Sequence, residues 1–263
     1  MTKRPLSGQR ILVTRAEGQS QSLVDRIENE GGISIELPLI AFRATNQDEL
    51  SKAIKQLNEV NWLIFTSANG VHYTIHAYEE QIREQREHFN IAVVGEKTED
   101  ALQSYGLKAD LLPSEFIAES LLQVLKDELK PNDKVLVTRG QLGRATLLEG
   151  LADLGVDAKE IIVYETYCPV NGEDVERALQ KSPTILTFTS SSTVRHFSQL
   201  CQERYIDLPN MSSQIACIGP IAKQTALMEG MKVDIMPTNY TIDALIEAII
   251  AHVKEEKNNG FII

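Results

Sequence analysis

Small polar residues and glycine follow the apolar runs of this 263-residue chain, at the points where strands of a parallel sheet would end. Such residues usually cap the helix that follows, and each cap stabilises the fold by about 1 kcal/mol. They also leave backbone N–H groups free at the helix N-terminus, where an anion can bind. The positions are Thr14-Arg15, Ser67-Ala68-Asn69-Gly70, Gly95-Glu96-Lys97-Thr98, Thr138-Arg139-Gly140, Tyr164, Ser190-Ser191-Ser192-Thr193 and Gly219-Pro220-Ile221.

Capping alone is the simpler interpretation of any one of these positions, but the pattern recurs in two halves of the chain. Arg15 and Arg139 occupy equivalent places, where each could bind a carboxylate or form a structural ion pair. The sequence leaves both roles open. Two rims of amide donors nevertheless predict a site for a ligand that carries many carboxylates.

Several common catalytic and cofactor motifs are absent from the sequence. No GxGxxG follows an apolar run, and residues 140–146 (GQLGRAT) lack the spacing of a phosphate-binding loop. His72 and His76 have a spacing that can bind metal, but no third ligand accompanies them. The nucleophile motif GxSxG is also missing. We therefore expect no metal, no cofactor and no covalent intermediate.

The charge balance excludes other classes of protein. The chain has 26 Lys+Arg against 37 Asp+Glu, a net charge of −11 that is unfavourable for binding nucleic acid. No segment approaches the ~20 apolar residues of a membrane-spanning helix, and the N-terminal residues lack the apolar core of a signal peptide. Cys168, Cys201 and Cys217 form no CxxC pair, as is typical of reduced thiols. We expect a cytoplasmic monomer that acts on a small molecule.

Internal repeats are the strongest signal in the chain. ILVTR at residue 11 recurs as VLVTR at residue 135, and LIFTS at residue 63 recurs as LTFTS at residue 186. Offsets of 123 or 124 residues also relate IAVVGEKTEDAL (91–102) to IACIGPIAKQTAL from residue 215, and the segment from Gly106 to that from Gly230. Such constant spacing indicates an internal duplication.

Each copy alternates apolar runs with amphipathic segments. The runs are nearly continuous, as in parallel strands covered on both faces, and residues 23–31, 120–129 and 242–249 have helical spacing. This alternation predicts doubly wound α/β units with a flavodoxin-like strand order of 2-1-3-4-5. The predicted strands are ILVT, SIELP, WLIFT, IAVV and ADLL in the first copy and KVLVT, EIIVY, ILTFT, IACI and VDIM in the second.

The repeats alone do not decide which strands share a sheet. Each copy consists of a two-strand piece and a three-strand piece. Consecutive pieces would give domains at 1–125 and 134–263. In the interleaved alternative, residues 41–165 form an inner domain and the two ends of the chain build the outer one.

The motifs together resemble the uroporphyrinogen-III synthase family, from Arg10 to Ile250. Each motif alone is weak, but their order and spacing are specific. The segments that carry the resemblance are ILVTRAEGQ, IFTSANGV, VVGEKTEDAL, GLKADLLPSE, VLVTRG, VYETY and the late IGPIAKQTAL, GMKVDIMP and TIDALIEAI.

The resemblance implies the interleaved fold: two flavodoxin-like domains, of residues 1–37 plus 171–263 and of residues 42–165, joined by linkers at 38–41 and 166–170. It also implies dehydration and cyclisation of hydroxymethylbilane, a linear tetrapyrrole polycarboxylate, with inversion of ring D through a spiro intermediate and without a cofactor. The alternative is a cytosolic two-lobed binding module for a polyanion. A flavin or nucleotide protein has only the analogy of fold in its favour.

The resemblance assigns roles to part of the rim. Tyr164 matches the family's cleft tyrosine, and its phenol would donate a hydrogen bond to the departing hydroxyl. We assign carboxylate binding to the other strand-end residues, mainly through backbone amides. They are Thr14, Arg15, Ser67, Ala68, Asn69, Gly95, Glu96, Thr98, Thr138, Arg139, Ser190, Ser191, Gly219, Pro220 and Ile221.

Overall fold

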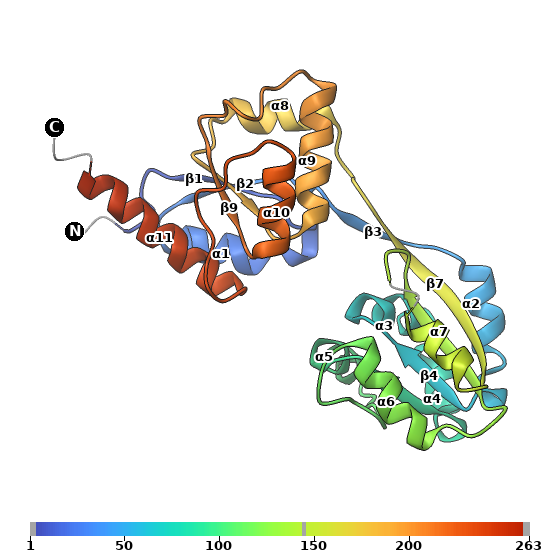
Figure 1. The fold of residues 1–263 in the computed structure, drawn as a ribbon. Coiled ribbons are helices and arrows are strands. Elements are labelled where there is room, and N and C mark those ends of the chain that lie inside the picture. The colour runs from blue at the N-terminus through green and yellow to red at the C-terminus, as the bar shows by residue number, and fades with distance from the viewer. Residues whose placement is uncertain (1–3, 144–145, 260–263) are drawn as a thin grey trace. The chain divides into compact units, whose positions relative to one another are not determined.

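The chain divides into two compact units in the computed structural model, which describes residues 4–143 and 146–259 (Figure 1). Unit 1 consists of Met1–Ala41 and Tyr167–Ile263, and unit 2 consists of Phe42–Thr166. The polypeptide therefore enters unit 2 near Ala41 and leaves it near Tyr167. The domain and linker bounds expected from the sequence stay predictions, and their ends at residues 1 and 263 lie outside the described residues.

Unit 1 contains a four-stranded parallel sheet of order β2-β1-β8-β9. The first two strands precede unit 2 in the chain and the other two follow it, so the two ends of the chain share one sheet. The strands are β1 (Arg10–Val13), β2 (Ile33–Glu36), β8 (Ile185–Phe188) and β9 (Gln214–Cys217).

Helices cover both faces of this sheet, because successive strand residues point to opposite sides. Leu12 packs with residues of α8, α9 and α10, whereas Ile11 packs with residues of α1 and α11. α1 ends before Gly31, whose φ of +85° is the left-handed stop expected from the sequence. The helices are α1 (Gln21–Asn29), α8 (Gly172–Gln180), α9 (Ser191–Glu203), α10 (Pro220–Met228) and α11 (Ile242–Asn259), and Glu17–Gln19 forms a 3-10 turn.

Unit 2 contains a five-stranded sheet of order β3-β7-β6-β4-β5. The pairs among its last four strands are parallel. β3 runs antiparallel to β7, because Arg43 contacts Glu165, the amide of Thr45 donates to Val163 and Asn46 donates to Ile162. The strands are β3 (Ala41–Ala44), β4 (Trp62–Phe65), β5 (Asn90–Val93), β6 (Lys134–Gly140) and β7 (Asp157–Tyr167).

The same layering recurs in unit 2. Leu63 and Phe65 of β4 pack with residues of α2, α3, α4 and α5, whereas Trp62 and Ile64 pack with residues of α6 and α7. The helices are α2 (Gln47–Ile54), α3 (Ala68–Ile75), α4 (Glu79–Glu84), α5 (Glu96–Ser104), α6 (Ala118–Glu128) and α7 (Thr146–Asp153), with 3-10 turns at Leu57–Glu59 and Arg86–His88.

The structure confirms the predicted α/β class with parallel sheets and differs from the prediction at the sheet edges. The expected fifth strands ADLL and VDIM are reduced to single parallel bridges, Ala92 to Leu111 and Ala216 to Ile235. Pro113 and Pro237 follow two residues after each bridge and cannot donate to a longer ladder. The sequence analysis also missed β3, which is short and only partly buried.

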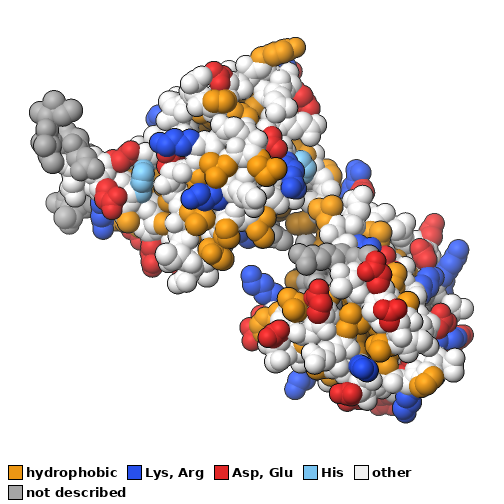
Figure 2. Space-filling view, viewed as in Figure 1, with side chains coloured by type: hydrophobic (Ala, Val, Ile, Leu, Met, Phe, Trp, Pro, Cys, Tyr) orange, Lys and Arg blue, Asp and Glu red, His pale blue; other side chains and the backbone are white. Residues whose placement is uncertain are grey.

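The surface agrees with the composition. On the face drawn in Figure 2, acidic and basic side chains are interspersed over both units. In the described part of the chain, no helix is both long enough and apolar enough to span a bilayer.

Candidate functional site

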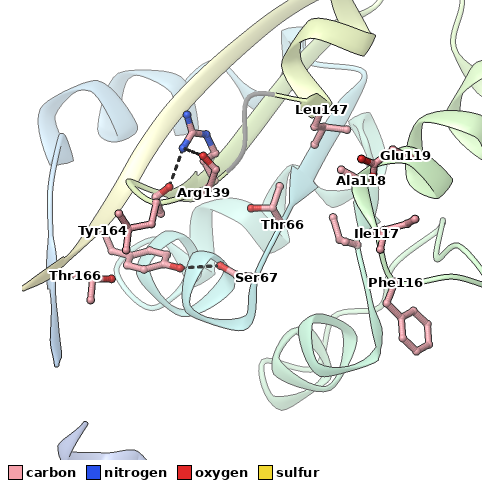
Figure 3. Close-up of a pocket in the computed structure, with 14 residues that line it drawn as sticks. Thr66, Ser67, Phe116, Ile117, Ala118, Glu119, Arg139, Leu147, Tyr164 and Thr166 are labelled. Carbon is pink, nitrogen blue, oxygen red and sulfur yellow. Dashed lines mark hydrogen bonds between the residues drawn. The ribbon is translucent and has the colours of Figure 1, made fainter. Parts of the chain in front are cut away.

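A pocket of about 440 Å³ lies in unit 2, where β4, β6 and β7 end and α6 begins (Figure 3). We call it the Tyr164 pocket. It occupies the edge where parallel sheets bind ligands, because the parallel strands of the sheet have their carboxyl ends there. The lining residues are Thr66, Ser67, Val94, Phe116, Ile117, Ala118, Glu119, Arg139, Gly140, Leu142, Gly143, Leu147, Tyr164 and Thr166.

The phenol of Tyr164 is hydrogen-bonded to the serine that begins α3. Tyr164 Oη lies 3.1 Å from Ser67 Oγ, and Ser67 Oγ also accepts a hydrogen bond from the amide of Gly70 at 3.0 Å. Ser67 is the N-cap of α3, with extended φ and ψ of −161° and 155°. Since the cap fixes Ser67, it fixes the position of the phenol as well.

Packing holds the Tyr164 ring from several sides. The ring stacks on Tyr73 with centroids 5.4 Å apart and meets Phe42 edge-on at 5.8 Å. It also lies against Gly140, where an added Cβ would be 2.3 Å from Cζ of Tyr164. A β-bulge between Arg139 and Gly140 sets this register. Only a glycine at position 140 therefore leaves room for the ring.

The guanidinium of Arg139 binds groups of unit 2 itself. Its Nε and Nη2 both bind the Glu160 carboxylate, and Nη1 donates to the carbonyls of Gly140, Gln141 and Gly143. The exposed fractions of the two side chains are 12% and 19%. A bidentate pair of this kind fixes the geometry of both partners. Of the two roles left open by the sequence, this arrangement favours the structural one for Arg139.

Arg15, the equivalent residue of unit 1, has a different environment. Its Nε donates to the carbonyl of Gln19 at 2.8 Å, and no carboxylate in the described chain forms a salt bridge with it. Partial burial lowers the pKa of Arg15 from its ordinary value. A half-buried arginine without a carboxylate favours a role in binding an anion.

The predicted caps of unit 1 are present. Ser190 Oγ accepts from the amide of Thr193 at 3.2 Å, as Ser67 does from Gly70. Gly219 precedes α10, and Pro220 is in its first turn. Ser191 is half-buried in the first turn of α9, and Ile221 is 73% exposed.

Three predicted threonines do not reach the surface. The hydroxyl of Thr14 donates to the carbonyl of Thr187 at 2.7 Å, inside the sheet. Thr138 is fully buried and its hydroxyl has no partner in the described chain. Thr98 is 5% exposed within α5. The backbone of these residues stays near the strand ends, but their side chains do not line the Tyr164 pocket.

Of the predicted site residues in unit 2, the pocket brings together Ser67, Tyr164 and Arg139. Asn69 lines a neighbouring pocket of about 570 Å³ with Tyr73. Ala68, Gly95 and Glu96 lie in the first turns of α3 and α5 or just before them and are not part of the lining.

The sequence analysis missed the apolar part of the lining. Phe116 and Ile117 lie on the loop before α6, a few residues after the predicted strand ADLL, whose end was not among the predicted site positions. A signal was available: the repeat aligns Phe116 with Tyr240, which places an aromatic residue at the same point of both copies. Leu142 lies two residues after β6, where an apolar residue gives no signal of anion binding.

Among the described residues, no group of three or more His, Cys, Asp and Glu side chains could hold a metal ion. Of the two histidines with metal-binding spacing, His72 instead bonds through Nδ1 with the phenol of Tyr105 at 3.0 Å. Burial and the nearby Glu79 raise the pKa of Tyr105.

Fold and site together define a class: an α/β protein of two parallel-sheet units whose pocket presents a fixed phenol at the strand ends. Comparison with known proteins identifies it further. The family model for uroporphyrinogen-III synthase HemD matches residues 6–247. The chain therefore belongs to the uroporphyrinogen-III synthase family.

Relatives of known name agree. The chain is 33% identical over 261 residues to uroporphyrinogen-III synthase of Synechococcus elongatus, covering 95% of this chain and 97% of that one. It is 23% identical to the Escherichia coli uroporphyrinogen-III synthase, covering 91% and 99%.

Solved structures share the fold. The chain is similar to a uroporphyrinogen III synthase mutant of Thermus thermophilus, with a TM-score of 0.61, 14% identity, and coverage of 94% and 100%. The Helicobacter pylori uroporphyrinogen-III synthetase gives a TM-score of 0.63 at 18% identity, with coverage of 92% and 98%.

Proposed function

We propose that this chain dehydrates and cyclises hydroxymethylbilane to uroporphyrinogen III. Membership of the family supports this activity, and the alternative of a non-enzymatic binding module has no support among the relatives. The observation that carries the proposal is the Tyr164 phenol, held by Ser67 in a pocket at the strand ends.

The hydrogen bonds around Ser67 leave the phenolic proton available. Ser67 Oγ accepts from the amide of Gly70, and its own proton can be donated to Tyr164 Oη. The phenol then directs its proton to a ligand in the pocket. In the proposed reaction this proton is hydrogen-bonded to the hydroxyl that leaves the bilane, which stabilises the negative charge developing on that oxygen.

Loss of the hydroxyl gives a cationic azafulvene, and the far ring attacks it through its substituted carbon. The spiro intermediate then fragments and recloses with ring D inverted. The bilane also closes by itself without inversion, so the chain must favour one folded conformer of the substrate. Catalysis in this proposal is mainly positioning, with one hydrogen-bond donor at the departing oxygen.

Carboxylates of the substrate are proposed to bind backbone amides at the starts of the helices that follow the strands. The unit 2 amides lie at α3 and α5, and the unit 1 amides at α9 and α10. Arg15 is proposed to bind a carboxylate directly, because its guanidinium has no carboxylate partner in the described chain. Arg139 is proposed to hold the loop of residues 140–143 instead.

The test is to supply freshly prepared hydroxymethylbilane and identify the uroporphyrinogen isomer after oxidation. We expect the inverted isomer, and formation of only the non-inverted isomer would contradict the proposed function. Tyr164→Phe should lower the rate by about 10- to 100-fold, the size expected when one hydrogen bond to a charged group is lost.

Tyr78→Phe is the matched control, because Tyr78 belongs to unit 2 but lies outside the Tyr164 pocket, where its hydroxyl contacts the carbonyl of Gln47. Both variants should keep the circular dichroism spectrum of the parent chain. An unchanged rate for Tyr164→Phe would remove the proposed donor role while leaving the activity in place.

A further inference from the structure

Exposed apolar side chains gather at the Tyr164 pocket. Among the described residues of unit 2, four large hydrophobic side chains are exposed, and three of them line this pocket. Phe116 is 49% exposed, Ile117 is 48% exposed and Leu142 is 69% exposed. We call these three residues the apolar wall. Concentrating exposed apolar surface at one place is unfavourable for the free protein and marks a surface that binds something.

The backbone holds Phe116 in place. A Cβ added at Gly95 would be 2.9 Å from Cβ of Phe116, so the glycine is what allows this close contact. Gly95 is extended, with φ of −167° and ψ of 171°, and directly precedes α5. Phe116 thus packs against Gly95 at the edge of unit 2 without being buried in its core.

The same arrangement is present in unit 1, 124 residues later. Gly219 has φ of −167° and ψ of 177°, and a Cβ added there would be 3.2 Å from Cγ of Tyr240. Tyr240 is 59% exposed. In both copies, a half-exposed aromatic ring packs against the glycine that precedes a helix. The arrangement is the same although the side chain is Phe in one copy and Tyr in the other. Recurrence of exposure as well as contact argues that the exposed ring face has a use.

Charge disfavours a carboxylate as the group against this wall. Among the described residues of the lining, the charged side chains are Arg139 and Glu119. Arg139 is neutralised by Glu160, whereas Glu119 is exposed and forms no salt bridge with any described residue. The described side chains of the lining therefore offer an anion no unpaired cation near the wall, which suits a flat ring without charge, or a ring that becomes cationic.

The pocket has room for such a ring. In Figure 3, Tyr164 and Phe116 lie at opposite ends of the labelled residues, with Ser67 and Ile117 between them, and the ring of Phe116 lies at the outer edge, directed away from Tyr164. Its volume of about 440 Å³ accommodates one pyrrole ring with its substituents. A ring placed there would have the phenol at one edge and the apolar wall at the other.

We infer that Phe116, with Ile117 and Leu142, is a substrate-positioning residue that contacts the face of the pyrrole ring whose hydroxyl departs. This inference rests on the proposed function and adds a specificity element to it. The wall selects the ring face, whereas Tyr164 acts on the departing oxygen. The carboxylates of the same ring are directed away from the wall, toward solvent or the helix amides.

The experiment compares Phe116→Ala with Leu112→Ala. Leu112 precedes α6 on the same segment and is 41% exposed, but it does not line the pocket. Phe116→Ala should raise KM for hydroxymethylbilane and lower kcat/KM about tenfold, the size of one aromatic contact. It should also increase the share of non-inverted isomer released. Leu112→Ala should keep the parent values, and the thermal midpoints of both variants should match the parent's.

Phe116→Tyr provides the rescue, because tyrosine is the residue at the equivalent position of unit 1. It should restore KM and the isomer ratio. An unchanged KM and isomer ratio in Phe116→Ala, in a chain that makes the inverted isomer, would overturn this inference and leave the proposed function intact. A parent chain that makes no inverted isomer would instead contradict the proposed function.

A second copy of the chain is the competing occupant of the wall. Sedimentation velocity over a range of concentrations distinguishes it. We expect the same sedimentation coefficient for the parent and Phe116→Ala at every concentration. A dimer of the parent that Phe116→Ala dissociates would overturn the inference, because the wall would then be a subunit interface.

Discussion

The strand ends of the two units have similar sequences, but their side chains form different contacts. The motif ending in Thr14-Arg15 and the motif ending in Thr138-Arg139 have the same register, since Val13 pairs with Glu36 and Val137 with Glu160. In unit 2 the glutamate binds the arginine. In unit 1 Glu36 instead accepts a hydrogen bond from Ser20 at 2.7 Å, and no carboxylate of the described residues pairs with Arg15.

The next positions diverge as well. Gly140 and Tyr164 of unit 2 correspond to Ala16 and Ile40 of unit 1. Ala16 is buried, at 5% exposed, and Ile40 has no hydroxyl to offer. The Tyr164 phenol, the glycine against its ring and the Arg139–Glu160 ion pair are thus found together in unit 2. The duplicated strands and helices therefore place the strand ends alike in both units. A few substitutions at these ends give unit 2 its phenol and its ion pair.

Gly140→Ala should break this difference most strongly. The added Cβ would overlap the Tyr164 ring, so the phenol must move away from Ser67. A displacement of about 1 Å can lower an enzymatic rate by about 100-fold, and we expect a loss of this size in the isomer assay. The reciprocal change in unit 1, Ala16→Gly, should leave the rate near that of the parent. Equal rates for the parent and Gly140→Ala would show that the ring has no fixed role.

Glu160→Gln tests the ion pair between Arg139 and Glu160. The change leaves the largely buried guanidinium of Arg139 without its counter-charge and should lower the free energy of unfolding by about 2–3 kcal/mol. Glu36→Gln, at the exposed equivalent position, should have a much smaller effect. Urea unfolding followed by fluorescence measures the change in unit 2, because the single tryptophan, Trp62, lies in β4. Similar effects from the two variants would contradict the structural role of Arg139.

Thr14→Val and Thr138→Val test the different hydrogen bonding of two equivalent threonine hydroxyls in the sheets. Thr14 bonds to the partner strand, and Thr187 of that strand bonds back to the carbonyl of Leu12. Unit 2 has Ile64 in place of Thr187, and the hydroxyl of Thr138 has no hydrogen-bond partner among the described residues. Thr14→Val should therefore cost about 1 kcal/mol of stability, whereas Thr138→Val should be neutral or stabilising. Thermal unfolding of both variants is the measurement, and the opposite ranking would contradict the hydrogen-bond assignment.

The smallest expected difference between the units concerns alkaline pH. All three cysteines lie in unit 1, and burial raises the pKa values of Cys201 and Cys217 to about 12. Folding favours the protonated thiols, so their contribution is fully present below the ordinary pKa of 9.0 and is lost as the pH rises toward 12.

Iodoacetamide labelling between pH 8 and pH 10 followed by mass spectrometry checks this prediction. Cys168, which is only partly buried, should react in the folded chain, while Cys201 and Cys217 should react only after unfolding of unit 1. Rapid labelling of all three cysteines at pH 8 would contradict the burial of these thiols.

The class of fold could be predicted from the sequence, and so could a candidate location for the site. Apolar runs of four or five residues, separated by amphipathic segments, are sufficient to specify parallel strands covered on both faces. The caps at Ser67 and Ser190 were predictable because a helix start needs an acceptor for its free amides. Tyr164 was predicted as a site residue from its place after a strand and from the resemblance of the surrounding motifs.

Only the tertiary structure decided what each rim residue contacts. Arg15 and Arg139 have the same local sequence but different partners. Glu36, on the strand beside Arg15, accepts a hydrogen bond from Ser20, whereas Glu160, on the strand beside Arg139, binds that arginine. Phe116 joins Tyr164 in one pocket although 48 residues separate them in the chain. Periodicity reports which face of an element is buried, whereas a pocket depends on packing between elements distant in sequence.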